Sequence, residues 1–297
     1  MSRGPRHAGS MTDIKNVTVL GTGVLGSQIA YQTAYTGFQV SVYDINDEVI
    51  AQAKKRFAGL AATYKKEVRG ASDETVDAAL ARISYFTDLG PAVADADLVI
   101  EAVPEVLALK QEIYEKLGAV APEKTIFATN SSTLLPSDMK AFTGRPAKFL
   151  ALHFANRLWI SNTAEVMGTA DTDPAVFDTI VEYAGEMGMV AIPIHKEKAG
   201  YVLNSLLVPL LTAAASLAAG GYSDPKDIDN VWRIATGAPL GPFQIYDIIG
   251  LTTPYNIMSH GDAGAQRLGA WLKENYIDKG KLGVASGEGF YSYPAAG

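Results

Sequence analysis

The feature that most restricts the fold is a glycine-rich segment, Gly-Thr-Gly-Val-Leu-Gly at residues 21–26, between a β-branched run and a helix-compatible run. In a strand, turn and helix, Gly21 permits the tight turn, Gly23 lets a phosphate approach the backbone, and Gly26 lets the helix pack on the strand. The amide groups that begin such a helix favour anions. The pattern predicts a phosphate-binding turn, although an ordinary glycine-rich loop is the alternative.

An acidic residue after the next apolar run favours a dinucleotide site. Residues 38–43 are apolar and are followed by Asp44, where a carboxylate accepts hydrogen bonds from the adenosine ribose hydroxyls and repels a 2′-phosphate. The alternative is an aspartate that only ends a strand. We expect NAD rather than NADP, held by Gly21, Gly23, Val24, Leu25, Gly26 and Asp44.

Short apolar runs alternate with helix-compatible segments through the first two thirds of the chain. Continuous hydrophobicity over about four to eight residues is typical of strands buried on both faces, and the alternation predicts a doubly wound α/β sheet of the Rossmann type. Residues 48–82 are polar and rich in Lys and Ala with helical spacing, which predicts a helical pair that projects from the sheet. The expected strands are residues 16–20, 38–43, 97–103, 125–129, 149–154, 163–167 and 189–194.

Changes along the chain predict two domains after a short leader. Residues 1–10 lack an apolar stretch and precede Met11, so we expect a cloning remnant outside the fold. Residues 11–196 are predicted to form the NAD-binding domain, and residues 197–297 an all-helical C-terminal domain. The apolar stretch at residues 202–219 is interrupted by polar residues and a proline, which favours a buried helix over a membrane span.

The composition narrows the possible partners and chemistry. The net charge of −7 argues against nucleic acid or an anionic membrane as the main partner. The absence of cysteine excludes disulfides, thiolate metal sites and a cysteine nucleophile, so redox chemistry needs a bound cofactor, and we expect no metal. Because no targeting segment is recognisable, we expect a cytoplasmic protein.

Candidates for a base near neutral pH are few, because the chain has only four histidines, one of them in the leader. His153 lies near the end of an apolar run, where open α/β sheets place their ligands, and Glu165 lies in the next run. A carboxylate beside an imidazole fixes its tautomer and stabilises its charged form. The alternative is a structural histidine and an unrelated surface glutamate.

Several short motifs follow one another in a fixed order. They are Asn130-Ser-Ser-Thr-Leu134, Leu152-His-Phe-Ala-Asn156, Glu165, Gly200-Tyr-Val-Leu-Asn204, Gly237-Ala-Pro-Leu-Gly-Pro-Phe243 and Gly287-Glu-Gly-Phe-Tyr291. From about Lys15 to Tyr291 the chain resembles the L-3-hydroxyacyl-CoA dehydrogenase family, in particular its 3-hydroxybutyryl-CoA dehydrogenases. The resemblance implies interconversion of an L-3-hydroxyacyl-CoA and a 3-ketoacyl-CoA with NAD, as in fatty acid metabolism. It also implies a homodimer formed through the C-terminal helical domain, which would bind substrate as well.

The resemblance implies a division of labour. His153 would take the hydroxyl proton, Glu165 would support the imidazolium, and Ser132 and Asn204 would position the substrate oxygen. Ser132 could instead cap a helix, and Asn204 could satisfy a helix contact. For the charged residues expected near the nicotinamide, first-turn helix charge is the alternative. The implied nicotinamide contacts are Glu105, Lys110 and Asn130.

The substrate is less constrained than the reaction. The resemblance implies that Lys65 and Lys66 meet phosphates of coenzyme A, although a solvated charge run is the alternative. After Asn156 the chain departs from the family, and its Arg157 favours a free 3-hydroxy acid or sugar acid, as in the L-gulonate 3-dehydrogenase and lambda-crystallin relatives. A nucleotide-binding protein without turnover is the third hypothesis. The expected substrate contacts are Lys65, Lys66, Ser132, Asn156 and Arg157.

Overall fold

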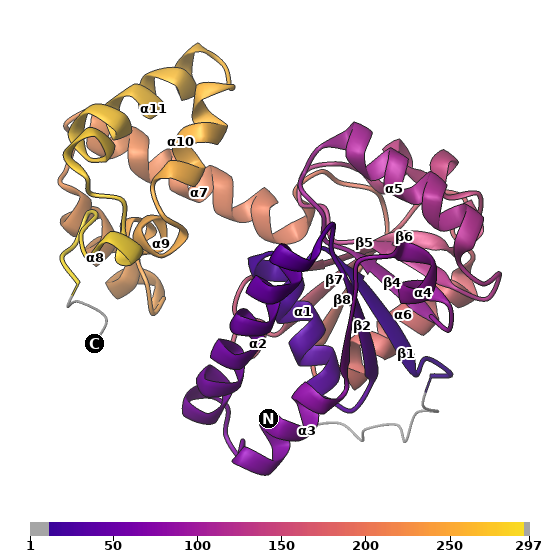
Figure 1. Cartoon of the computed structure of the whole chain (residues 1–297). Helices are drawn as coiled ribbons and strands as arrows, with labels where there is room; N and C mark the ends of the chain where they lie inside the picture. Colours follow the sequence, from indigo (N-terminus) through magenta and orange to yellow (C-terminus); the bar gives the residue numbers. More distant parts are fainter. Residues whose placement is uncertain (1–11, 294–297) are drawn as a thin grey trace, which may run out of the picture. The chain divides into compact units, whose positions relative to one another are not determined.

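The computed structural model describes residues 12–293, which form two compact units (Figure 1). The first unit ends at Val202 and the second begins at Leu203, whereas the sequence led us to expect the change after residue 196. Each unit has its own hydrophobic core. The expected cloning remnant, residues 1–10, lies outside the described residues.

The first unit is built on one eight-stranded sheet in the order β3-β2-β1-β4-β5-β6-β7-β8. Neighbouring strands are parallel except β6 and β7, which are antiparallel. The chain runs outward from β1 to β3 and then returns to β4 on the other side of β1, which confirms the doubly wound Rossmann-type fold. The strands are β1 (Asn16–Leu20), β2 (Gln39–Tyr43), β3 (Ile83–Phe86), β4 (Leu98–Glu101), β5 (Ile126–Thr129), β6 (Phe149–Phe154), β7 (Thr163–Gly168) and β8 (Val190–Ile194).

The two edge strands differ from the expectation. The sequence analysis missed β3, because only its first residue is fully buried and no continuous apolar run marks it. We expected β8 to be buried on both faces, but none of its residues is fully buried, and Val190 is 54% exposed. A strand at the edge of a sheet has less cover than a central one, so hydrophobicity alone does not report its burial.

Helices cover both faces of the sheet, and α2 and α3 confirm the expected helical pair (Figure 1). Val17 and Val19 of β1 enter the core that includes α1, α2, α3 and α6, whereas Leu20 enters the core with α4 and α5. The helices are α1 (Val24–Tyr35), α2 (Asp47–Glu67), α3 (Asp73–Ala81), α4 (Leu89–Val93), α5 (Leu107–Val120) and α6 (Pro174–Glu186), with 3₁₀ turns η1 (Pro136–Asp138), η2 (Lys140–Thr143) and η3 (Pro146–Lys148).

The second unit is helical, as expected. Its core includes Phe243, Tyr246, Leu251, Leu272 and Phe290. Its elements are α7 (Tyr201–Ala219), which begins in the first unit, α8 (Pro225–Thr236), α9 (Pro242–Ile249), α10 (Thr252–Ser259), α11 (Ala263–Asn275), η4 (Ile277–Lys279) and η5 (Val284–Ser286).

Helix α7 contradicts the expectation of a buried helix. Only 17% of its most apolar window is buried, and Leu206 is 70% exposed. By length and composition alone the helix could cross a membrane, a test that core helices of soluble proteins also pass. Burying one large aliphatic side chain is worth about 1.5–3 kcal/mol, so leaving this apolar surface in water is unfavourable.

Candidate active site

The glycine-rich turn joins β1 to α1, and its three glycines lack a side chain for different reasons. A Cβ on Gly21, whose φ is +90°, would lie 2.6 Å from the Ala102 carbonyl oxygen, and a Cβ on Gly26 would lie 2.0 Å from the Gly21 oxygen. Apart from Gly23 itself and its neighbours along the chain, no described protein atom lies within 4 Å of the place that a Cβ on Gly23 would take. The chain's own packing therefore requires Gly21 and Gly26, whereas the space beside Gly23 is open for a ligand.

The start of α1 offers hydrogen-bond donors beside this open space. Gly23 caps the helix without a side-chain hydrogen bond, and the first turn holds no acidic residue. Val24 is 66% exposed, and Leu25 packs partly buried against the core. Because N–H groups at an uncapped helix N-terminus bind phosphate, the residues present fit the pyrophosphate of NAD.

Asp44 follows β2 and holds the glycine-rich turn. Its Oδ2 accepts hydrogen bonds from the N–H and the hydroxyl of Thr22, at 2.7 and 2.6 Å, and its Oδ1 accepts one from the N–H of Ile45. The sequence analysis did not single out Thr22, because the glycine motif does not specify the residue at this position. The ribose contact expected of Asp44 stays a prediction, supported by its position beside the turn.

His153 and Glu165 meet where the sheet becomes antiparallel. They are directly opposite residues of β6 and β7, so their side chains share one face of the sheet. The Nδ1 of His153 lies 2.9 Å from Oε2 of Glu165, and the residues are only 4% and 5% exposed. An ionised Glu165 requires a proton on Nδ1, which leaves the lone pair of Nε2 free to accept one. The pair can therefore act as a general base through Nε2.

Ser132 faces Nε2 from the loop after β5. Its hydroxyl oxygen lies 3.0 Å from Nε2 of His153. The loop is held by Glu105, whose Oε1 accepts hydrogen bonds from the Ser131 hydroxyl at 2.5 Å and from the N–H groups of Ser132 and Thr133 at 3.0 and 2.9 Å. Burial opposes the charge on Glu105, but these hydrogen bonds and a nearby ammonium group outweigh it and lower the pKa of the carboxyl to about 2. An ionised Glu105 therefore fixes the loop that contains Ser132.

The nearby ammonium group belongs to Lys110, which forms a buried ion pair. Its Nζ lies 2.6 Å from Glu101 and 3.3 Å from Glu105, and the side chains of Lys110 and Glu101 are 1% and 0% exposed. Glu101 also accepts hydrogen bonds from Tyr114 and Thr129. Lys110 is therefore buried and paired, and the alternative of first-turn helix charge stays open for it. The cofactor contacts expected of Glu105 and Lys110 stay predictions, because the contacts described here are with the chain itself.

The three asparagines singled out by the sequence have different surroundings. Asn130 is buried, and its Oδ1 accepts a hydrogen bond from the N–H of Phe154 at 3.0 Å, which ties the end of β5 to the end of β6. Asn156 is exposed just after β6. Asn204 is half-buried in the first turns of α7, within the second unit. Their roles toward cofactor and substrate stay predictions.

The basic residues expected to meet the substrate lie on the surface, and two of them pair with carboxylates of the chain. Nη2 of Arg157 lies 3.0 Å from Glu67, which ends α2. Lys65 lies 2.7 Å from Asp73, and Lys66 is exposed. Exposed ion pairs of this kind are weak, so a substrate anion can compete for these groups. Their substrate contacts also stay predictions.

Tyr201 is a neighbour of the dyad to which the sequence analysis gave no role. Its ring stacks on the imidazole of His153, with ring centroids 4.3 Å apart and planes 9° from parallel. Its hydroxyl donates a hydrogen bond to the carbonyl oxygen of Ser131 at 2.7 Å. Burial raises the pKa of Tyr201, so this hydroxyl keeps its proton. The available signal was the aromatic residue directly after Gly200 in the fourth motif.

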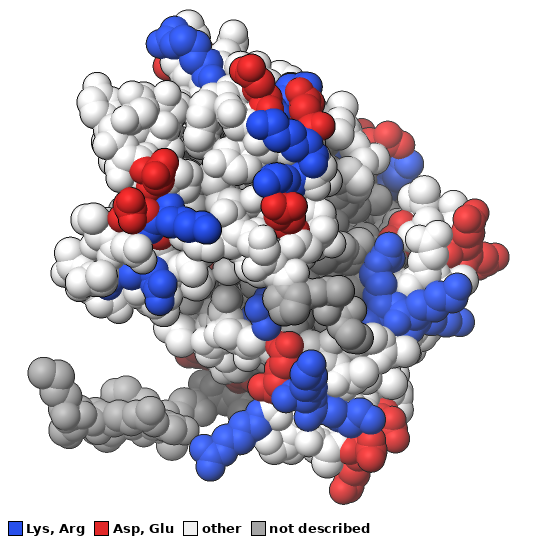
Figure 2. All heavy atoms as spheres, turned by 90° about the vertical axis from the view of Figure 1, so that its left-hand side faces the viewer, with Lys and Arg blue, Asp and Glu red and all other residues white. Residues whose placement is uncertain are grey.

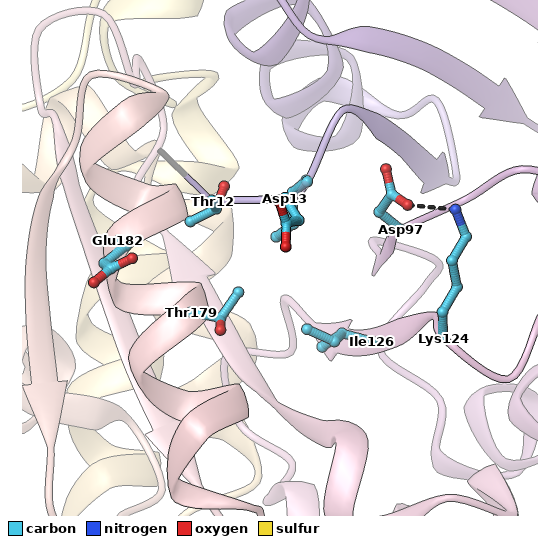
Figure 3. A pocket seen from close by; sticks show the side chains of 8 residues that line it. Thr12, Asp13, Asp97, Lys124, Ile126, Thr179 and Glu182 are labelled. Atoms are coloured by element: carbon cyan, nitrogen blue, oxygen red, sulfur yellow. Dashed lines mark hydrogen bonds and ion pairs between the residues drawn. The ribbon is translucent and has the colours of Figure 1, made fainter. Parts of the chain in front are cut away.

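A polar hollow of about 360 Å³ lies at the amino ends of strands β4 and β5 (Figure 3). Its lining includes Asp97, which precedes β4, and Lys124, which precedes β5, and these two form an ion pair at 2.5 Å. Open α/β sheets bind ligands at the carboxyl ends of their strands, where His153 and the glycine-rich turn are found. We therefore assign the active site to that end and not to the hollow.

Comparison with known proteins identifies the family of the chain. Family models of 3-hydroxyacyl-CoA dehydrogenase match the chain over residues 16–198, the NAD-binding domain, and over residues 200–293, the C-terminal domain. The mitochondrial hydroxyacyl-coenzyme A dehydrogenase of Rattus norvegicus is 34% identical over 291 residues, which cover 94% of this chain and 91% of the rat protein.

Solved structures extend the comparison. A diketoreductase that acts on dicarbonyl compounds is 66% identical, with a TM-score of 0.93 and coverage of 95% of this chain and 100% of that one. The (S)-3-hydroxybutyryl-CoA dehydrogenase of Ralstonia eutropha is 27% identical, with a TM-score of 0.81 and coverage of 95% and 100%. The chain therefore belongs to the 3-hydroxyacyl-CoA dehydrogenase family and is an NAD-dependent dehydrogenase.

Proposed function

We propose that the protein interconverts a 3-hydroxyacyl-CoA and a 3-ketoacyl-CoA, with His153 as the general base and acid. The observation that carries the proposal is the hydrogen-bonded row of Glu165, His153 and Ser132, at the same end of the sheet as the glycine-rich turn. A base is needed there, because loss of a hydride from C3 makes the attached hydroxyl acidic. Bound NAD supplies the hydride acceptor for oxidation, and NADH the hydride for reduction.

Each side chain of the row has one task. In oxidation, Nε2 of His153 takes the hydroxyl proton, the O–H electron pair forms the carbonyl π bond, and C3 gives up a hydride. Glu165 stabilises the resulting imidazolium through its contact with Nδ1. Ser132, within hydrogen-bond distance of Nε2, positions the substrate oxygen beside that nitrogen. In reduction His153 returns the proton.

The substitution His153→Ala tests this proposal. We expect the rate of NADH oxidation with acetoacetyl-CoA to fall by about 10²- to 10⁴-fold, while the Kd for NADH stays within about twofold of wild type. His195→Ala, at an exposed histidine of the same unit, is the matched control and should leave both values unchanged. Unchanged turnover in His153→Ala would show that the proposed mechanism is wrong.

A second candidate substrate is a dicarbonyl compound without coenzyme A. The relative that is 66% identical acts on dicarbonyl compounds, and a 3-ketoacyl-CoA is itself a 1,3-dicarbonyl, so the same dyad can serve both. Comparing kcat/KM for acetoacetyl-CoA, acetoacetate and ethyl acetoacetate separates the candidates. The first proposal requires that acetoacetyl-CoA be preferred, by about tenfold or more if coenzyme A contributes even one good contact. A preference for the ester would instead establish the second candidate.

We also propose that the protein is a cytoplasmic homodimer that pairs through its second unit. Three apolar side chains, Leu206 in α7 and Val231 and Ile234 in α8, are 70%, 69% and 83% exposed, and a second copy of the chain would cover them. On the face shown in Figure 2, the described Lys and Arg side chains lie among Asp and Glu, and much of the surface is uncharged. Light scattering should give the mass of a dimer, and the substitution Ile234→Lys should weaken the association of the two copies. Cell fractionation tests the location.

A further inference from the structure

We propose that Tyr201 is a positioning residue for the reaction, through simultaneous contacts with His153 and with the loop that contains Ser132. The inference rests on the proposed function, in which Nε2 of His153 exchanges a proton with the substrate. Tyr201 acts through these two residues and does not need to touch the substrate itself.

The stacked ring fixes the plane of the imidazole. The hydrogen bond to Glu165 sets the direction of Nδ1, but the imidazole could still tilt about that bond. The ring of Tyr201 lies parallel to it at 4.3 Å, and the residues are 1% and 4% exposed, so tilting would drive one buried ring into the other. An aromatic face also favours a cation, which supports the imidazolium. Glu165 and Tyr201 together thus define where Nε2 points.

The hydroxyl of Tyr201 holds the loop that contains Ser132, the hydrogen-bond partner of Nε2 of His153. It donates to the carbonyl oxygen of Ser131 at 2.7 Å, and the next residue, Ser132, places its hydroxyl 3.0 Å from Nε2 of His153. Glu105 holds the same loop by accepting hydrogen bonds from the hydroxyl of Ser131 and the N–H of Ser132. One side chain therefore contacts His153 and the residue next to Ser132, whose hydroxyl faces Nε2.

The backbone at this position supports a functional role. Tyr201 has φ +52° and follows Gly200 at φ +80°. A bulky residue in the left-handed region costs about 1–3 kcal/mol, and such strain persists where surrounding contacts require it. The adjacent N–H of Val202 donates to Oε1 of Glu165 at 2.9 Å. The turn at residues 200–202 therefore contacts the carboxylate and the imidazole of the dyad and the loop of Ser132.

A purely structural role is the competing explanation, because Tyr201 also packs with Ala151 and Met167. Two variants separate the explanations: Tyr201→Phe keeps the ring and removes the hydroxyl, whereas Tyr201→Leu removes both. Tyr183 provides matched controls, since it is equally buried in the same unit and its hydroxyl lies 3.1 Å from the hydroxyl of Thr33. Tyr183→Phe and Tyr183→Leu remove the same groups from a core position.

The measurements are kcat per folded protein, the Kd for NADH and the isotope effect with deuterated NADH, on whichever of acetoacetyl-CoA or ethyl acetoacetate reacts faster. Tyr201→Phe should lower kcat by about two- to tenfold, the worth of one hydrogen bond. Tyr201→Leu should lower kcat by about 100-fold and raise the isotope effect, because misplaced groups slow the chemical step. In both variants the Kd for NADH should stay within about twofold of wild type, and the Tyr183 variants should lose stability without losing kcat.

The outcomes are distinguishable from those for the proposed function. If His153→Ala loses turnover while Tyr201→Leu keeps the kcat of its Tyr183→Leu control, the inference about Tyr201 is wrong and the dehydrogenase mechanism stands. If His153→Ala keeps turnover, the proposed function fails and this inference fails with it. Should Tyr201→Leu not fold, Tyr201→Phe decides: a kcat equal to that of Tyr183→Phe overturns the tether to Ser131.

Discussion

Buried carboxylates occur in both units, but they have different kinds of partner. In the first unit, Glu165 faces the imidazole of His153, a group that can both accept and donate a proton. In the second unit, Asp229 accepts hydrogen bonds from the N–H groups of Phe243 and Gln244 and from the hydroxyl of Tyr291. The first carboxylate can take part in proton transfer, whereas the second is held by donors that keep their protons.

Asp247 repeats the arrangement of Asp229, and each of the two aspartates leaves no room for a side chain at a nearby glycine. Asp247 accepts hydrogen bonds from the N–H groups of Phe290 and Tyr291, and a Cβ on Gly289 would lie 2.0 Å from its carboxylate. A Cβ on Gly241 would likewise lie 2.2 Å from Asp229. The motifs at residues 237–243 and 287–291 therefore form the sockets of two buried aspartates. These two aspartates hold segments of the second unit together, whereas Glu165 in the first unit faces the imidazole proposed to act as the base.

The largest effect that the comparison predicts is on catalysis, from Glu165→Gln. The carbonyl oxygen of the new side chain would accept from Val202, so its amide NH₂ would face Nδ1 of His153 and force the proton onto Nε2. With the wrong tautomer, kcat should fall by about 10³- to 10⁴-fold, and the free energy of unfolding should change by less than about 1 kcal/mol. A loss of activity smaller than about tenfold would break the distinction between the two units.

The next effect is on stability, from Asp229→Asn. Both oxygens of Asp229 accept an N–H, so an amide must place its own NH₂ against one of these donors. The cost of a buried unsatisfied donor predicts a loss of about 2–3 kcal/mol in urea unfolding, with kcat per folded molecule unchanged. Asp227→Asn, an exposed aspartate on the same helix, is the control. If activity fell while stability did not, Asp229 would belong with Glu165.

Glu105→Gln sharpens the comparison, because Glu105 is held by fixed donors but serves the active site. Glutamine can place its carbonyl oxygen where Oε1 accepts these hydrogen bonds, but it loses the negative charge and turns its NH₂ toward the ammonium group of Lys110. The loop of Ser132 should therefore loosen, and kcat should fall by roughly three- to tenfold. The folded pKa, about 2, lies below the ordinary value of 4.5, so ionised Glu105 contributes stability above pH 4.5 that is lost as pH falls toward 2. Urea unfolding should show the wild type's advantage over the variant shrinking across that range. Glu112→Gln, at an exposed position of α5, is the control.

The fold could be predicted from the sequence where hydrophobic pattern and burial coincide. The central strands, the glycine-rich turn and the helical pair at α2 and α3 met this condition. The pattern failed at β3 and β8, which lie at the sheet edges, and at α7, whose apolar surface is mostly uncovered by this chain. Burial at such places depends on neighbours that a local pattern does not contain.

The candidate site was predictable only in part, because residues far apart in the chain create it. Spacing could nominate His153 and Glu165, but their contact depends on the antiparallel register of β6 and β7. The buried pair of Glu101 and Lys110 and the stack of Tyr201 depend in the same way on tertiary packing. Charged and aromatic residues are common at exposed or core positions, so sequence alone could name Lys110 and the motif that contains Tyr201 but not these contacts.

The smallest predicted effect comes from Tyr31→Phe. It tests a buried polar group that has neither a proton-exchanging partner, as Glu165 has, nor fixed hydrogen-bond donors, as Asp229 has. The hydroxyl of Tyr31 in α1 has no hydrogen-bond partner among the described residues, and the ring packs on Tyr35, Phe57 and Tyr64. Removing an unsatisfied hydroxyl while the ring keeps its shape should leave stability unchanged or raise it by up to about 1 kcal/mol. Urea unfolding should show the opposite sign for Tyr183→Phe, which loses a bonded hydroxyl. If Tyr31→Phe destabilised the protein as much as Tyr183→Phe, the hydroxyl of Tyr31 would be hydrogen-bonded to a bound water. The partners that decide the role of a buried polar group would then have to include solvent.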